Sequence, residues 1–184
     1  MIINKRVMLK EELKNTLTEI IKKQNVDGLI GFMENSGVEY HMADLRGPLA
    51  MATFEGVFID LKRIMDRAWM DDTRLIYFVI LHETAHIKRM KKLGKTEILR
   101  NLSLEDFDTF FEHVIGEELI ADRYGSYVYH KLNRENIPHY MTQELNLDIN
   151  KEKYKQTARG FFGRIQNDEK KYKELFEQFI IKKY

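Results

Sequence analysis

Two histidines and a glutamate interrupt a long apolar segment near the middle of the chain. Residues 75–90 read LIYFVILHETAHIKRM, and the sequence HETAH within them places His82 and His86 four residues apart. On an α-helix this spacing puts both imidazoles on one face, one turn apart. A helix this apolar packs into a core, so the fold has to bury a helix that carries titratable side chains.

The spacing of these residues is typical of a zinc site. Two imidazoles one turn apart can take two positions of a tetrahedral zinc ion, whereas Glu83, about 100° round the helix, reaches a water on the metal. Zinc lowers the pKa of that water towards roughly 7, and the carboxylate removes its proton as the water attacks a carbonyl. HExxH also arises by chance, so two partly buried, hydrogen-bonded histidines on a core helix are the alternative interpretation.

A second helical stripe offers the missing ligand. Its members recur at steps of three and four and are apolar or small apart from two carboxylates: Phe107, Phe111, Val114, Glu118, Ala121, Asp122, Gly125 and Val128. Burying a carboxylate without a partner is costly. We therefore predict Glu118 as the third metal ligand and Asp122 as the acceptor of a hydrogen bond from the free ring N–H of a ligand histidine. Small residues on this stripe would let the two helices approach closely.

Several alternatives remain open for these side chains. Glu117 can be the ligand instead of Glu118, although its stripe, shared with His113 and Ile120, is more polar. Glu118 and Asp122 can also belong to a solvated helix face or to salt bridges with Lys or Arg. The donor that stabilises an oxyanion beside the metal is open too. Its candidates are His113, Tyr124, Tyr127, His130, His139 and Tyr140.

The rest of the chain predicts an α+β fold. Four short apolar runs, GLIGFM, VEYHMA, LAMATF and GVFID, are separated by turn-rich sequence between residues 28 and 60. They predict a small, mostly antiparallel sheet of three or four strands in hairpin-like succession, packed on the HETAH helix and the second helix. The expected helices cover residues 8–23, residues 61–70, Asp71 or Asp72 to about Lys92 with a stop at Gly94, and Ser103, which forms a capping box with Asp106, to about Tyr129.

The C-terminal residues 150–184 predict a helical extension with an apolar face and a basic face. Such helices usually pack by the apolar face and solvate the basic one, and binding of a partner or nucleic acid is the alternative. No internal repeat or linker divides the sequence. Residues 1–184 therefore predict a single domain.

Composition excludes several kinds of site. The 184 residues include no cysteine, so disulfides, thiolate metal sites and thiol nucleophiles are excluded, and any metal must be held by His, Asp and Glu. Thirty basic and 29 acidic residues leave a net charge of +1, which gives no electrostatic reason to expect nucleic acid or an anionic membrane as a partner. The sequence shows neither a signal-peptide core nor a run of transmembrane length, so we expect a cytoplasmic protein.

In three segments the chain resembles the ImmA/IrrE-type zinc metallopeptidases, and more broadly the gluzincin pattern of HExxH followed by Glu-x-x-x-Asp. The segments are GVFIDLKRI, LIYFVILHETAHI and EELIADRYGSYV, and the resemblance covers a minimal catalytic part at about residues 28–130. It implies one zinc ion per chain held by His82, His86 and Glu118, with Glu83 as catalytic base and Asp122 in contact with a ligand histidine. It also implies hydrolysis of a protein or peptide substrate, regulatory proteins among them.

The resemblance also implies that the substrate pairs with a sheet edge, for which LAMATF is the candidate; a central strand is the alternative. Two features depart from the family. Many relatives carry a DNA-binding helix-turn-helix, which is not recognisable here, and RYGSYVYHKLN stands where they continue with small, apolar residues and proline. A non-catalytic zinc-containing regulatory or protein-binding module on the same fold is the second hypothesis. The presence of Glu83 argues against it, since a structural site needs no base.

Overall fold

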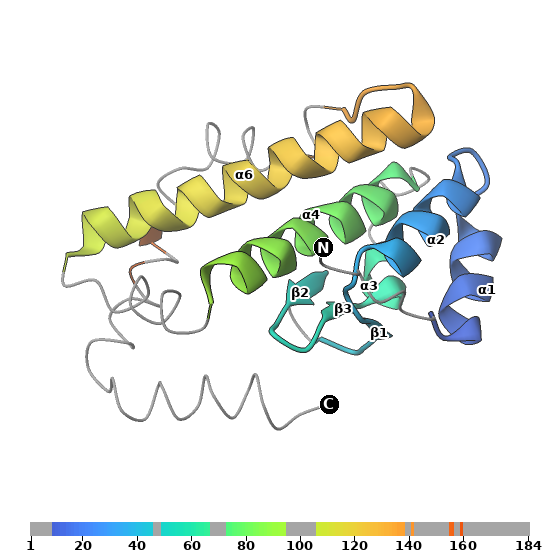
Figure 1. Ribbon diagram of the computed structural model, residues 1–184, viewed down its shortest axis with the longest axis horizontal. Helices are drawn as coiled ribbons and strands as arrows, with labels where there is room; N and C mark the ends of the chain where they lie inside the picture. Colours follow the sequence, from blue (N-terminus) through green and yellow to red (C-terminus); the bar gives the residue numbers. More distant parts are fainter. Residues whose placement is uncertain are drawn as a thin grey trace, which may run out of the picture.

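The computed structural model describes residues 9–45, 49–66, 73–94 and 106–138, together with Met141, Lys155, Gln156 and Arg159. This part of the chain is α+β, as predicted, with five helices and three short strands (Figure 1). The helices are α1 (Glu11–Ile20), α2 (Val26–Asn35), α3 (Leu61–Met65), α4 (Arg74–Leu93) and α6 (Phe107–Asn133). The strands are β1 (Tyr40–Met42), β2 (Ala50–Ala52) and β3 (Val57–Ile59).

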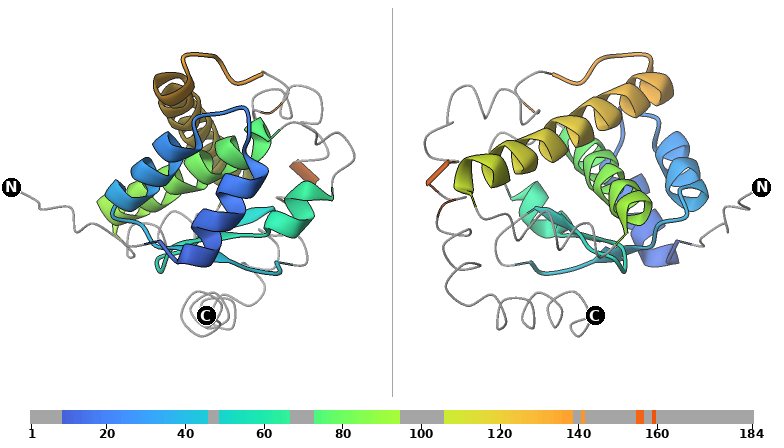
Figure 2. Two further views of the ribbon diagram at one scale, coloured as in Figure 1. Left: turned by 90° about the vertical axis from the view of Figure 1, so that its right-hand side faces the viewer. Right: turned by 60° about the vertical axis from the view of Figure 1, so that its left-hand side comes forward.

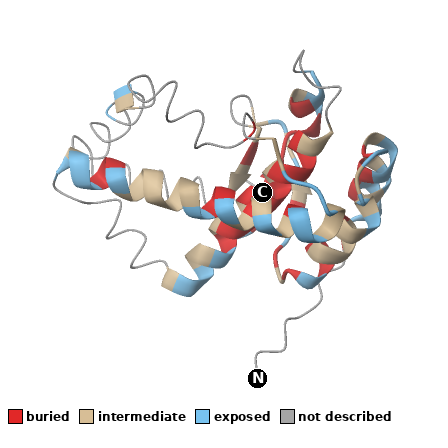
Figure 3. Cartoon of the chain, turned by 90° about the horizontal axis from the view of Figure 1, so that it is seen from above, coloured by how far each residue is buried: buried red, intermediate tan, exposed pale blue. Residues whose placement is uncertain are grey.

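Helix α4 is the central element of the fold. It lies between α6 on one side and the sheet on the other (Figures 1 and 2). Because both layers cover it, most of its residues from Leu75 to Ile87 are buried, and Figure 3 shows buried residues gathered around the crossing of α4 and α6. Gly94, with a φ of 80°, ends the helix as predicted and donates its N–H to the carbonyl of Met90. None of the described helices is long and apolar enough to cross a membrane.

The sheet is mixed, not mostly antiparallel. Its strand order is β1-β3-β2, and β2 and β3 form an antiparallel hairpin closed by a hydrogen bond from Thr53 N–H to Gly56 O. Strand β1 pairs with β3 in parallel, with Tyr40 opposite Val57. Strand β3 is therefore the central strand, with β1 parallel to it on one side and β2 antiparallel to it on the other. Strand β2, from LAMATF, is therefore an edge strand of the described sheet.

The prediction of a strand at GLIGFM, residues 28–33, is wrong, because this run belongs to α2. Asn25 caps the helix, and its side-chain oxygen accepts a hydrogen bond of 2.8 Å from the N–H of Gly28. Leu29 and Met33, four residues apart, are fully buried. Burial of this helical stripe outweighs the low helix propensity of the two glycines.

The other helices differ from the prediction at their ends. Helix α1 is shorter than the predicted range 8–23, and α3 ends at Met65. Helix α6 begins after Asp106, whose carboxylate accepts hydrogen bonds from the N–H groups of Asp108 and Thr109, so Asp106 is itself the N-cap. Several predicted features lie outside the described residues: the caps at Asp71, Asp72 and Ser103, and nearly all of residues 150–184.

One hydrogen-bonded junction sets α6 against α4 and α2. The N–H of Asn25 donates to the side-chain oxygen of Asn133 at the end of α6, at 2.8 Å. The hydroxyl of Tyr77 in α4 donates to the carbonyl of Asn25, at 2.9 Å. The ring of Tyr77 also packs edge-on against that of Tyr129, with 5.2 Å between centroids. These contacts fix the two helices that carry the predicted metal ligands.

Candidate metal centre

Three side chains with metal-binding atoms converge where α6 crosses α4. His82 and His86 come from α4 and Glu118 from α6, and their ligand atoms lie within 4.8 Å of one another. The Nε2 atoms of the two histidines are 3.1 Å apart. Glu118 lies 3.2 Å from Nε2 of His82 through one carboxylate oxygen and 3.4 Å from Nε2 of His86 through the other. This group can hold a metal ion, and the described residues contain no other group of this kind.

Asp122 orients the first of these histidines. Its Oδ1 lies 2.8 Å from Nδ1 of His82, and both side chains are buried. With Nδ1 occupied, Nε2 is the ring nitrogen directed at His86 and Glu118. The structure thus brings Asp122 to the position that the sequence predicted for it, one helical turn beyond Glu118 on α6.

The carboxylates of this centre attract positive charge. Burial lowers the pKa of His82, but hydrogen bonds with Asp122 and Glu118 outweigh it and raise the pKa to about 10. Burial raises the pKa of Glu118, but hydrogen bonds with both imidazoles outweigh it and lower the pKa to about 2. Glu118 is therefore an anion at neutral pH. A proton on His82, or a metal cation in its place, offsets this negative charge.

Glu83 lies next to the cluster and faces β2. Its carboxylate accepts a hydrogen bond from the backbone N–H of Ala52. Burial raises the pKa of Glu83, against the opposite effect of the imidazoles of His86 and His82. A carboxylate whose pKa moves towards neutrality is suited to accept and return a proton.

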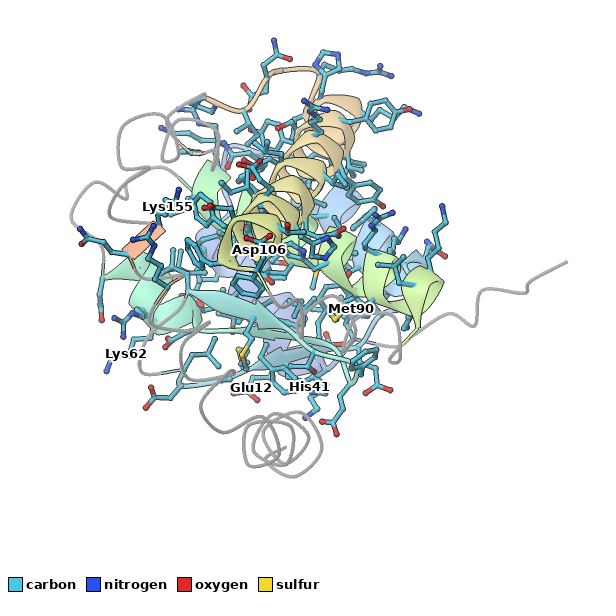
Figure 4. The ribbon with its side chains drawn as sticks, turned by 90° about the vertical axis from the view of Figure 1, so that its left-hand side faces the viewer. Glu12, His41, Lys62, Met90, Asp106 and Lys155 are labelled. Carbon is cyan, nitrogen blue, oxygen red and sulfur yellow. The ribbon has the colours of Figure 1, made fainter. Side chains whose placement is uncertain are left out.

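A cavity of about 360 Å³ opens beside the cluster, between β2, α4 and α6. Strand β2 contributes Ala50, Met51 and Ala52. The helical residues in its wall are Glu83, His86, Arg89, Met90 and Leu93 of α4 and His113, Val114, Glu117 and Glu118 of α6, of which Met90 is labelled in Figure 4. The cavity thus joins the predicted base and two predicted ligands to an edge strand.

Glu117, the alternative ligand, is paired with Arg89 and does not belong to the histidine cluster. Both of its carboxylate oxygens accept hydrogen bonds of 3.1 Å from the guanidinium of Arg89. The structure therefore brings Glu118, not Glu117, to the histidines. Arg89 was not among the predicted site residues. It could have been identified from the sequence, because it follows His86 by three residues and therefore lies on the same helical face.

A chain of buried hydroxyls holds the opposite side of the HETAH segment. Thr84 is fully buried and donates a hydrogen bond of 2.6 Å to the carbonyl of Ile80. Its oxygen lies 2.8 Å from the hydroxyl of Tyr40, which lies 3.1 Å from the hydroxyl of Ser36. This chain ties α4 to β1 and α2 and fixes the rotation of α4 about its axis. Sequence reasoning missed it because the partners lie 44 residues apart.

Close packing at Gly125 supplies a first prediction. A Cβ at Gly125 would lie 3.0 Å from the ring of Phe78 and 3.3 Å from the backbone nitrogen of His82, so the small residue allows α6 to approach α4. Gly125→Ala should destabilise the fold by about 1–3 kcal/mol and weaken metal binding, because α6 has to move away from His82. Gly116→Ala, also on α6, is the matched control: its Cβ would meet nothing within 4 Å, so it should preserve or increase stability. Equal unfolding midpoints for the two variants would contradict the close approach.

The chain was also compared with known proteins. No family model, no curated protein and no solved structure matches it. The resemblance to the ImmA/IrrE-type peptidases therefore stays an expectation from the HETAH and Glu118–Asp122 segments. Any function has to be inferred from the geometry of the metal centre.

Proposed function

We propose that the protein is a zinc-dependent metallopeptidase that hydrolyses peptide bonds of a protein substrate. The observation that carries this proposal is the convergence of His82, His86 and Glu118 beside a cavity that is lined by two of them, by Glu83 and by an edge strand. A purely structural metal site needs neither a carboxylate beside it nor an open cavity. The resemblance to ImmA/IrrE-type peptidases, which act on regulatory proteins, points the same way.

The donor set fits zinc. Two imidazole nitrogens and one carboxylate oxygen are the ligands of many catalytic zinc sites, which keep the fourth position open. Bonds of about 2.0–2.1 Å in tetrahedral arrangement separate neighbouring ligand atoms by roughly 3.3 Å. The two Nε2 atoms are 3.1 Å apart, and each lies 3.2–3.4 Å from a different carboxylate oxygen of Glu118. These separations are close to the spacing that a zinc ion requires, which supports the proposal.

Each residue of the centre then has a chemical task. When bound, zinc supplies a positive charge that lowers the pKa of a water molecule and polarises a substrate carbonyl. Glu83 accepts the proton of the attacking water and returns it to the nitrogen of the leaving amine. The hydrogen bond from Ala52 holds the Glu83 carboxylate at the cavity wall. Asp122 keeps the ring of His82 in the orientation that leaves Nε2 for the metal.

Strand β2 offers a way to hold an extended substrate. The hydrogen bonds on either side of the β2–β3 pair join Thr53 to Gly56 and Asp60 to Leu49, so the alternation along an antiparallel pair turns the backbone groups of Ala50 and Ala52 away from β3. Glu83 uses the N–H of Ala52. The remaining outward groups can pair with the main chain of a peptide in the cavity, which places its carbonyl near the metal.

Metal analysis and a cleavage assay together test this proposal. Purified protein should hold about one zinc ion per chain, and His82→Ala should hold almost none, because a ligand has been removed. The wild-type protein should cleave members of an internally quenched peptide library, lose this activity with a chelator and regain it with zinc. A protein that stays metal-free in the presence of zinc, or that is zinc-loaded yet cleaves neither peptides nor unfolded proteins, would contradict the proposal.

The choice between the adjacent glutamates gives a sharper prediction. Glu118→Ala should weaken zinc binding on the order of 100-fold, because it removes one of three protein ligands. Glu117→Ala should change zinc affinity by less than about threefold, since Glu117 is paired with Arg89 outside the ligand set. Competition with a chromogenic chelator measures both constants. The reverse order would show that Glu117 is the ligand.

A further inference from the structure

The wall of the cavity contains a third histidine, His113, which is neither a proposed metal ligand nor a partner of one. His113 of α6 is half-buried and lies in the wall with Glu83 and His86. The sequence left several candidates for an oxyanion donor, and among those in the described part of the chain His113 is the residue that lines the cavity. Within that part, the ring of His113 makes no hydrogen bond, ion pair or ring contact. An imidazole always has at least one N–H to donate, so His113 presents an unused donor or acceptor to a molecule in the cavity.

The other candidates are engaged or remote. The hydroxyl of Tyr124 accepts a hydrogen bond of 2.9 Å from Lys88. Tyr127 is 58 % exposed, and His130 is exposed near the end of α6. None of these three residues, which follow Glu118 on α6, lies in the cavity wall. His139 and Tyr140 lie outside the described residues.

Arg89 is the strongest rival, because it also lines the cavity. Its Nε and one terminal nitrogen donate to Glu117, in a bidentate pair that links α4 to α6. Such planar, two-point pairs between guanidinium and carboxylate are the strongest of the charge-assisted hydrogen bonds. Moving Arg89 towards a substrate would break this pair, whereas His113 can donate without giving up any contact in the described structure.

Glu83, the proposed base, and His113 lie on different sides of the cavity. Glu83 is held to β2 by the N–H of Ala52, on the sheet side of α4. His113 belongs to α6, which packs on the other side of α4 (Figure 1). A peptide that runs along β2 into the cavity therefore has the base on the strand side and the imidazole on the α6 side. Acyl transfer requires this arrangement: the water attacks the carbonyl carbon from one side, and a donor forms a hydrogen bond to the carbonyl oxygen from another.

We propose that His113 is a catalytic residue that donates a hydrogen bond to the carbonyl oxygen of the substrate as that oxygen becomes an oxyanion. This assignment rests on the proposed peptidase function. In the step, the water oxygen bonds to the carbonyl carbon, its proton passes to Glu83, and the C=O π-electron pair moves to the oxygen that His113 contacts. When the C–N bond breaks, that electron pair re-forms the C=O bond and Glu83 returns the proton to the amine nitrogen. No other reactant is needed.

Binding of a transition-state analogue tests the assignment without turnover. The probe is an end-blocked Leu–Leu phosphinic pseudo-dipeptide, whose tetrahedral phosphinate oxygens copy the oxyanion, and the matched end-blocked Leu–Leu amide is the ground-state reference. Zinc-loaded His113→Ala should bind the phosphinate about 100-fold more weakly than wild type, with the amide affinity changed less than about threefold. His113→Gln, which keeps an N–H donor, should recover part of the loss. In peptide cleavage the alanine variant should lower kcat about 100-fold at nearly constant KM.

The controls separate this assignment from the proposed function. His130→Ala, an exposed histidine on the same helix, should behave as wild type in every assay. Zinc content and the unfolding midpoint of His113→Ala should match wild type, which shows that the centre is intact. A wild type that binds zinc and the phosphinate, with His113→Ala within about threefold of it, overturns the role of His113 alone. A wild type that binds neither zinc nor the phosphinate overturns the proposed function and the role of His113 with it.

Discussion

Replacing Glu83 with glutamine should reduce peptide cleavage on the order of 1000-fold or more and leave zinc in place. The amide cannot accept the proton of the attacking water, and a general base contributes on the order of 10²–10⁴-fold to rate. Zinc is retained because the three ligand atoms come from His82, His86 and Glu118. The amide oxygen of the substituted side chain can still accept the hydrogen bond from Ala52, so the cavity wall keeps its shape. The measurement is kcat/KM on one quenched peptide together with zinc per chain.

Glu83→Gln should also affect the stability of the folded protein. Burial raises the pKa of Glu83, so the folded protein holds this proton more tightly than the unfolded chain. Stability from this group is therefore lost as pH rises above about 4.5, because ionisation of the buried carboxyl group opposes folding. In chelated protein, Glu83→Gln should unfold at the same temperature as wild type or higher. Glu112→Gln, at an exposed position on α6, should change neither activity nor stability. If Glu83→Gln kept a tenth of the wild-type activity, Glu83 would not be the base.

The long helices and the cluster of His82, His86 and Glu118 were predictable because their signals are periodic and local. The apolar run from Leu75 to Ile87 fixes α4, and the stripe that contains Glu118 and Asp122 identifies the face of α6 that meets it. A carboxylate removed from water needs a polar or charged partner, and Glu118 and Asp122 both contact His82 on α4. The choice between Glu117 and Glu118 followed from which stripe was more apolar.

Features that depend on pairing across the chain could not be predicted in the same way. The strands are three residues long, too short for alternation to separate them from a helical run such as GLIGFM. The parallel pairing of β1 with β3 depends on where the hairpin packs, which no local sequence specifies. Arg89 with Glu117 and Tyr40 with Thr84 are contacts between distant segments. The cavity wall, and with it the selection of His113, emerges only when β2, α4 and α6 are assembled.

Removing the metal should make stability fall steeply above neutral pH. His82 has a pKa of about 10 in the fold and about 6.5 in an unfolded chain. Its contribution is fully present below pH 6.5 and is lost as pH rises towards 10, by about 1.4 kcal/mol per pH unit. Glu118, with a pKa of about 2, contributes above pH 4.5 and loses that contribution only in acid. Urea unfolding of chelated protein should thus show falling stability between about pH 7 and 9.5.

This pH window separates His82 from the buried tyrosines. Burial raises the pKa of Tyr40 and Tyr77 to about 12, and because unfolded tyrosine ionises near pH 10, their effect on stability begins only above the window. In protein saturated with zinc the metal replaces the proton on His82, so the steep fall should disappear. In chelated His82→Gln it should disappear as well, since no group at this position titrates. A chelated His82→Gln variant with the wild-type slope would show that the proton lies elsewhere, and that Asp122 and Glu118 do not hold His82 as a cation.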